Sequence, residues 1–354
     1  MTWEPSAFVA AFGLIALLAG RTPLVGERAV RRSAPFPALR AETLPPRQAA
    51  SARDTTTQPD PSGQSRFFFA GKGRLLLHHG HFDTVLDVRY RHADGSYDAG
   101  ALKQIRHFFR SREDGVEAPI SLRLIELLAY IQVRYHPQQM TLLSGFRSPE
   151  YNANLRAAGG AAAQGSLHTE GLAADITLAG LDMFRLWQQL RKLRIGGVGY
   201  YHTGRFLHID TGPPRFWEET TSRVTENLSA GNARLFLRTD FDRYPRLQGA
   251  LLSLHRVTAF PLLVALHATL TGPGRTTPVT LKPVGHGIEV RGGCLAIVKP
   301  ARAHVFRIVS QEPSTSEPAL HARGRTHLVL STCAPRIENT PLHVGSNPIE
   351  ITGR

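Results

Sequence analysis

The 354-residue sequence contains little cysteine, methionine or tryptophan: two, three and three residues, respectively. Two cysteines exclude a disulfide-rich scaffold and a cysteine-rich zinc finger. Charged residues make up only 20% of the chain and hydrophobic residues 42%, a composition typical of a globular protein. We therefore exclude a wholly disordered chain, a collagen-like chain and a polytopic membrane protein.

Acidic residues are scarce relative to basic ones. The chain has 28 Asp and Glu against 42 Lys and Arg, which gives a formal net charge of +14, and it also carries 16 His. Such a charge favours polyanionic surroundings, namely nucleic acid, acidic lipid or an anionic cell wall. The arginines are scattered and form no recognised nucleic-acid-binding motif, so we expect no nucleic-acid partner.

An apolar segment lies near the N-terminus. Residues 7–20 read AFVAAFGLIALLAG, which has the length of a signal-peptide apolar region and is short for a membrane span. The basic residues follow this run instead of preceding it, which argues against export by the positive-inside rule. We interpret residues 1–32 as a signal or membrane-anchor segment; the alternative is an apolar tail packed on the core.

Residues 33–65 are rich in Pro, Ser, Thr, Gln and Ala and predict a disordered linker, because such a composition cannot bury enough apolar surface to fold. The two N-terminal segments together predict a periplasmic or cell-envelope protein, exported or anchored. The inner membrane is then a possible partner through the N-terminal segment.

The pattern from residue 66 to 217 predicts a small α+β domain. Residues 84–88 alternate like a strand, and His92 to Gly95 form a turn signal. Helical stripes cover residues 98–110, 120–135 and 181–193, with Asp98 as an expected N-cap and Pro137 ending the second helix. The tract His78-His79-Gly80-His81 is interpreted as solvated histidines at a strand end.

Two motifs in this domain carry chemistry. Residues 166–175 read SLHTEGLAAD, and residues 206–210 read FLHID. His168, Asp175 and His208 are a ligand set that suits a catalytic zinc ion, which takes three protein ligands and leaves one position for water. Asp210 shares a strand face with His208, because side chains on a strand repeat every two residues. It is therefore a candidate outer-shell acceptor or general base.

The stretches SGFRSPEYNANLR, SLHTEGLAADI, GGVGYY and FLHIDTGPPRFW resemble zinc peptidoglycan peptidases of the D-alanyl-D-alanine carboxypeptidase and Hedgehog-like fold, closest to the murein endopeptidase K group. The resemblance implies zinc held by His168, Asp175 and His208, and hydrolysis of peptide bonds in cell-wall stem peptides or crosslinks. It also implies that Arg147 grips a carboxylate or carbonyl of the substrate.

The sequence departs from the related carboxypeptidases at one position. These enzymes often carry an acidic general base three residues before the last histidine ligand, where this chain has Arg205. The base is then unassigned; Asp210 is our first candidate and His202 the second.

Beyond residue 217 the resemblance ends. We interpret residues 218–254 as a connector and residues 255–354 as a small all-β domain, a sandwich or a barrel, because short β-branched runs alternate there with turns. Cys294 and Cys333 both fall in this region. A disulfide between them suits an exported protein, and two buried thiols are the alternative.

The sequence therefore predicts a zinc-dependent peptidoglycan peptidase in cell-wall remodelling, with peptidoglycan peptides as its partners. The alternative is a non-catalytic zinc-bearing module that binds peptidoglycan or protein. Fold alone does not separate the two, since one fold hosts both enzymes and binding modules.

Overall fold

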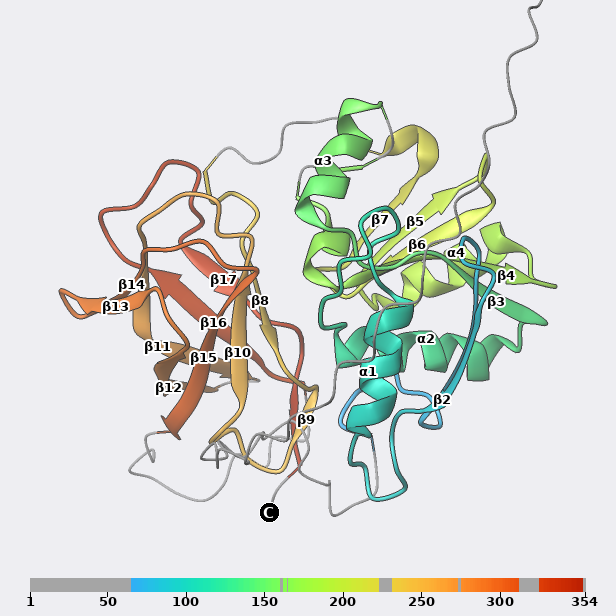
Figure 1. The fold of residues 1–354 in the computed structure, drawn as a ribbon. Coiled ribbons are helices and arrows are strands. Elements are labelled where there is room, and N and C mark those ends of the chain that lie inside the picture. The colour runs from blue at the N-terminus through green and yellow to red at the C-terminus, as the bar shows by residue number, and fades with distance from the viewer. Residues whose placement is uncertain are drawn as a thin grey trace, which may run out of the picture. The chain divides into compact units, whose positions relative to one another are not determined.

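The computed structural model describes residues 65–159, 162–163, 165–222, 231–272, 275–311 and 325–352, which belong to one compact unit (Figure 1). The expected N-terminal segment (1–32) and all but the last residue of the expected linker (33–65) lie outside these residues. None of the helices in the described ranges has the length and apolar character needed to span a membrane.

A seven-stranded mixed sheet forms the centre of the first half. Its order is β2-β1-β3-β4-β6-β5-β7, with β1–β3 and β5–β7 parallel and the other pairs antiparallel. The strands are β1 (Arg74–His79), β2 (Val85–Arg89), β3 (Gln139–Ser144), β4 (Ala173–Ala179), β5 (Gly197–Tyr201), β6 (Phe206–Asp210) and β7 (Arg215–Glu218).

Four α-helices accompany this sheet: α1 (Ala99–Phe108), α2 (Leu122–Tyr135), α3 (Pro149–Ala157) and α4 (Met183–Leu193). Helices α1, α2 and α4 confirm the three helices expected from the apolar stripes. The side chain of Asp98 caps α1 by accepting a hydrogen bond from the Ala101 N–H, as expected. Helix α3 was not predicted, because its sequence carries no apolar stripe; Ser148 caps it and a proline occupies its first turn.

The second half is built from strands. Nine of them form one sheet: β8 (Phe236–Thr239), β10 (Leu251–His255), β11 (Leu262–Gly272), β12 (Arg275–Val284), β13 (Ile288–Arg291), β14 (Cys294–Ile297), β15 (Ala303–Gln311), β16 (His327–Thr332) and β17 (His343–Gly345). Strands β9 (Arg243–Tyr244) and β18 (Glu350–Ile351) form a separate parallel pair.

This arrangement confirms the α+β class. Strands β8, β9 and most of β10 fall in residues 218–254, the expected connector, so part of that segment contributes to the β-sheets. The assignment to a Hedgehog-like fold, the choice between sandwich and barrel and the division into domains stay predictions.

Cys294 and Cys333 form a disulfide, which resolves the two alternatives left by the sequence. Cys294 begins β14, and Cys333 follows β16. Both strands pair with β11, so the disulfide links two neighbours of one central strand.

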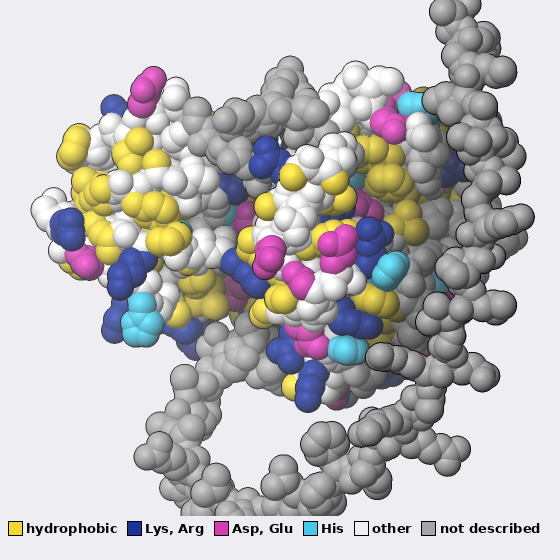
Figure 2. Space-filling view, turned by 45° about the horizontal axis from the view of Figure 1, so that its top comes forward, with side chains coloured by type: hydrophobic (Ala, Val, Ile, Leu, Met, Phe, Trp, Pro, Cys, Tyr) yellow, Lys and Arg dark blue, Asp and Glu magenta, His cyan; other side chains and the backbone are white. Residues whose placement is uncertain are grey.

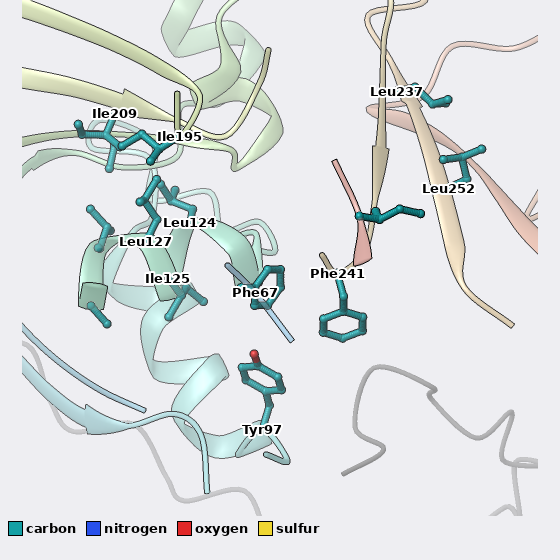
Figure 3. Close-up of a cluster of buried hydrophobic side chains, with 14 of the residues drawn as sticks. Phe67, Tyr97, Leu124, Ile125, Leu127, Ile195, Ile209, Leu237, Phe241 and Leu252 are labelled. Atoms are coloured by element: carbon teal, nitrogen blue, oxygen red, sulfur yellow. The ribbon is translucent and has the colours of Figure 1, made fainter. Parts of the chain in front are cut away.

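One continuous cluster of buried apolar side chains runs through both halves. Figure 3 shows part of it, including Phe67, Leu124, Phe241 and Leu252. The rings of Phe67 and Phe241 lie with their centroids 5.3 Å apart, and both residues are almost fully buried. Packing of this kind ties the residues before β1 to the residues after β8.

The surface is mixed in charge. Figure 2 shows Lys and Arg side chains spread over the drawn face, with Asp and Glu side chains among them. In the histidine tract at the end of β1, His81 is exposed as expected and His78 is half-buried, whereas His79 departs from the expectation of solvated side chains. His79 is only 6% exposed, and its Nδ1 accepts hydrogen bonds from the N–H groups of His81 and Phe82.

Candidate metal centre

Three residues far apart in the sequence converge at one end of the central sheet. His168 lies on a single 3₁₀ turn, η2 (Leu167–Glu170), while Asp175 lies on β4 and His208 on β6. Strands β4 and β6 are antiparallel neighbours in which Asp175 and His208 are direct partners. The pairing register therefore places two of the three side chains together.

The turn that carries His168 depends on its flanking residues. The hydroxyl of Ser166 accepts a hydrogen bond from the His168 N–H, and Gly171 ends the turn with φ +71°. A Cβ at Gly171 would lie 2.3 Å from the carbonyl oxygen of Pro119, so no other residue fits there. This chain reversal brings η2 back over the start of β4.

The three candidate ligand atoms form a small triangle. His168 Nε2 lies 3.1 Å from His208 Nδ1 and 3.2 Å from Asp175 Oδ1, and His208 Nδ1 lies 2.9 Å from Asp175 Oδ1. In a tetrahedral zinc site with bonds of about 2.0–2.1 Å, neighbouring ligand atoms are about 3.3 Å apart. The observed triangle is close to that size, and its three residues can hold one metal ion.

The opposite nitrogen of each imidazole is already occupied. His168 Nδ1 donates to the carbonyl oxygen of Gly145 at 2.7 Å, and His208 Nε2 donates to Asp210 Oδ2 at 2.9 Å. These bonds fix the tautomers and leave a lone pair on each of the two facing nitrogens. Two such lone pairs at 3.1 Å repel unless a proton or a cation lies between them, which is the arrangement that a metal site needs.

The electrostatics of the triangle also suit a cation. Burial, together with the guanidinium of Arg147, lowers the pKa of His168 below its ordinary value. Burial opposes ionisation of Asp175, but His168 and Arg147 hold the pKa of this carboxyl well below its usual range. Burial also opposes protonation of His208, but the carboxylates of Asp175 and Asp210 raise its pKa. The site thus combines an ionised carboxylate with imidazoles that exchange a proton for a metal.

Arg147 lies beside this triangle. Its Nη2 donates to Asp175 Oδ2 at 2.6 Å and its Nε donates to the hydroxyl of Ser144 at 2.9 Å. Asp175 therefore points Oδ2 at the guanidinium and Oδ1 at the two histidines. Arg147 also lines the cavity described below. Its position is compatible with the expected contact with a substrate, which stays a prediction.

Asp210 lies behind His208, on the side away from the ligand triangle. It is fully buried, and it also accepts two hydrogen bonds from Arg215, at 3.1 and 2.5 Å. The backbone N–H groups of Gly197 and Gly212 donate to it as well. Burial alone would raise the pKa of Asp210, but Arg215 and His208 lower it below its ordinary value. Because its oxygens already accept these hydrogen bonds and its pKa is low, the Asp210 carboxylate is suited to orienting His208 and poorly suited to accepting a proton from water.

The second candidate base, His202, is not brought to the triangle. Its imidazole is 55% exposed and its Nδ1 lies 3.0 Å from Glu219 Oε2. Arg205, in the same turn between β5 and β6, is exposed and has φ +48°. Among the described residues that line the cavity, Asp175 is the one acidic residue.

The triangle opens into a cavity of about 530 Å³, a volume within the usual range for a ligand site. Aromatic residues form part of its wall, including Tyr151, Phe206 and Trp217.

Comparison with known proteins agrees with these observations. The family model described as peptidoglycan L,D-endopeptidase MepK matches residues 70–217. Peptidoglycan L,D-endopeptidase MepK of Escherichia coli strain K12 is 36% identical over 136 residues, which are 38% of this chain and 75% of that protein. A probable peptidoglycan L,D-endopeptidase MepK of Haemophilus influenzae is 30% identical over 124 residues, 34% of this chain and 67% of that protein.

The chain belongs to the MepK family. This confirms the resemblance drawn from the motifs and the prediction of a metallopeptidase. The three candidate metal ligands all lie within the matched residues, which we call the MepK region (70–217). The nine-stranded sheet lies outside it.

Two residues of the MepK region that touch the site were not singled out from the sequence. Arg215 binds Asp210, and the indole of Trp217 lies against His208 with ring centroids 5.3 Å apart. Gly199 makes room for this indole, since a Cβ there would lie 2.4 Å from it. Arg215 and Trp217 both lie in the stretch FLHIDTGPPRFW, and their place in this family motif is the sequence feature that could have indicated them.

Proposed function

We propose that this chain is a zinc-dependent hydrolase of peptide bonds in peptidoglycan stem peptides or crosslinks, acting in cell-wall remodelling. Membership of the MepK family supports the substrate class. The observation that carries the proposal is the convergence of His168, Asp175 and His208, with their three ligand atoms within 3.2 Å of one another.

Zinc is the metal that we assign to the site. Two imidazoles and one carboxylate are a frequent ligand set of catalytic zinc, and they leave a coordination position for water. When bound, zinc lowers the pKa of a water molecule and polarises a carbonyl group.

The surrounding residues have supporting roles in this mechanism. Asp210 and Gly145 hold the two imidazoles in the ligand tautomer, and Arg147 turns the Asp175 carboxylate toward the histidines. The aromatic wall of the cavity excludes water from one side of a bound peptide. These contacts orient the ligands before any substrate arrives, which reduces the reorganisation that the reaction requires.

A non-catalytic zinc-bearing binding module is the second candidate function. The observation that favours it is the absence of an acidic residue other than Asp175 from the described cavity lining, together with the exposed Arg205 in place of the acid of related carboxypeptidases. Such a module would bind peptidoglycan or a protein without cleaving it.

We also propose that the protein works in the periplasm or elsewhere at the cell envelope, since its substrate is there. In this proposal residues 1–32 direct export or anchor the chain in the inner membrane. Nucleic acid is not among the proposed partners.

Mass spectrometry of muropeptides tests the function directly. The purified full chain with zinc should cleave crosslinked muropeptides, and a chelator or His168→Ala should abolish both zinc binding and cleavage. His107→Ala is the control, because His107 is an exposed histidine on α1 that pairs with Glu117 and lies outside the cavity. Cleavage that persists without metal refutes the mechanism; zinc binding without cleavage establishes the binding module.

A further inference from the structure

The cavity at the metal centre is strongly basic. Five arginines line it, whereas Asp175 is the one acidic residue among the described lining residues. The arginines are Arg112, Arg147, Arg215, Arg234 and Arg256. Two of these five are already bound to carboxylates of the site, Arg147 to Asp175 and Arg215 to Asp210. Basic side chains thus outnumber acidic ones among the described lining residues, a composition that suits an anionic group.

Arg256 comes from outside the MepK region. It directly follows β10 of the nine-stranded sheet, and its Nη2 donates to the carbonyl oxygen of Gly165. A Cβ at Gly165 would lie 3.7 Å from the Arg256 Nε, so the guanidinium packs directly on this glycine. Gly165 precedes Ser166, which caps the turn that carries His168. An arginine of the β-rich half therefore reaches the loop of the first metal ligand.

The charge of Arg256 is only partly compensated. Its side chain is 15% exposed, and its nearest carboxylate oxygen, Glu170 Oε1, lies 4.0 Å from Nε. The other oxygen of Glu170 lies 2.6 Å from His255 Nδ1. The buried Nε of Arg256 makes no hydrogen bond to any described atom. Burial and the charge of Arg215 lower the pKa of Arg256 to about 10, which agrees with a local excess of positive charge.

We propose that Arg256 forms a carboxylate-binding subsite at the active-site cavity, which selects peptide substrates that carry a free carboxylate next to the scissile bond. The proposal rests on the proposed function and adds the substrate feature that the cavity recognises. Arg256 lines the cavity, and a guanidinium is well suited to bind a carboxylate through short charge-assisted hydrogen bonds. Because Arg256 lies beyond residue 217, this selectivity belongs to this chain's β-rich half.

A pair of matched substrates tests the subsite. Both are the same crosslinked stem-peptide dimer, with the carboxylate next to the scissile bond free in one and amidated in the other. The zinc-loaded full chain should cleave the free acid with a kcat/KM about 10–100 times higher, since a hydrogen-bonded charge contributes at about that level. Arg256→Gln should raise KM for the free acid by a similar factor and leave the amide within about twofold of its original kcat/KM.

Arg307→Gln is the matched control. Arg307 also comes from the nine-stranded sheet and donates to a glycine carbonyl, that of Gly249, but it does not line the cavity. It should leave the preference for the free acid unchanged. Arg256→Lys keeps the charge without the planar donor pair, so it should retain part of the preference. Arg256→Lys therefore provides the test of the subsite if Arg256→Gln does not fold.

The outcomes separate the subsite from the function. A wild-type chain that cleaves neither dimer refutes the proposed function. A wild-type chain that cleaves both dimers equally well refutes the subsite and leaves the function standing. The subsite is also wrong if Arg256→Gln or Arg256→Lys lowers kcat/KM for both dimers by the same factor, because a purely structural arginine would produce that result.

Discussion

The role of Asp210 can be decided by one substitution, Asp210→Asn. The carboxylate accepts the Nε2–H of His208 at 2.9 Å through Oδ2, and the same oxygen receives Arg215 Nη2 at 2.5 Å. An amide keeps one acceptor oxygen, which the N–H groups of Gly197 and Gly212 retain. Its NH₂ group then faces two donors, so His208 loses the acceptor that fixes its tautomer.

The expected cost falls on metal binding. Outer-shell partners of a ligating histidine contribute about 10–100-fold to metal affinity, which corresponds to roughly 1.4–2.7 kcal/mol. We expect the zinc dissociation constant of Asp210→Asn, measured by competition with a chromogenic chelator, to rise by this factor. At saturating zinc, kcat on a crosslinked muropeptide should stay within about tenfold of wild type.

Asp242→Asn is the control, because Asp242 is a buried carboxylate that also binds an arginine, Arg123, but lies outside the cavity. It should lower the melting temperature without changing zinc affinity. The reasoning fails if Asp210→Asn binds zinc normally and yet loses about 10²–10⁴-fold in kcat at full occupancy. That loss is the size expected for removal of a general base, and Asp210 would then be the proton acceptor.

Three further outcomes are expected. Arg147→Ala should weaken zinc binding about tenfold or more in the same chelator competition, because Asp175 loses the guanidinium that orients it; unchanged affinity contradicts this role. Replacing both Cys294 and Cys333 by Ala should lower the free energy of unfolding by about 4 kcal/mol, the loop-closure estimate for a separation of 39 residues; denaturant titration measures it, and a change below about 1 kcal/mol refutes the estimate. Burial, together with the nearby charge of Arg110, lowers the pKa of His79 from 6.5 to about 4, so the unfolded chain binds more protons in this range and the free energy of unfolding should fall as the pH drops from 6.5 to 4. His79→Asn should reduce that pH dependence, which denaturant titrations at several pH values measure; a slope equal to that of the wild-type protein contradicts it.

Local patterns in the sequence predicted the helices well. The apolar stripes of α1, α2 and α4 and the cap Asp98 are properties of short segments, so they can be read without knowledge of the fold. Helix α3 was missed because its first turn is set by Ser148 and Pro149 and not by an apolar face. The short strands β8 and β9 were missed because their partners, β10 and β18, lie elsewhere in the chain.

The same limit applies to the site. His168, Asp175 and His208 were predicted as a set because they stand in the family motifs, and the structure brings them together, two of them through the pairing of β4 with β6. The engagement of Asp210 with Arg215, and the exposure of His202, depend on side-chain directions that spacing does not specify. The place of Arg256 at the cavity could not be predicted from the sequence, because its contact with Gly165 joins residues 91 positions apart.

The packing of Phe67 on Phe241 determines whether the MepK region can be produced without the β-rich half. Cutting after residue 217, to match the relatives' region of similarity, would leave the ring of Phe67 facing water at a cost of about 1.5–3 kcal/mol. The same cut would strip Arg238 from the hydroxyls of Thr211 and Ser121. An excised fragment would thus expose an apolar surface and unpaired hydroxyl groups that the intact chain covers. Inactivity of such a fragment would therefore say nothing about the intact protein.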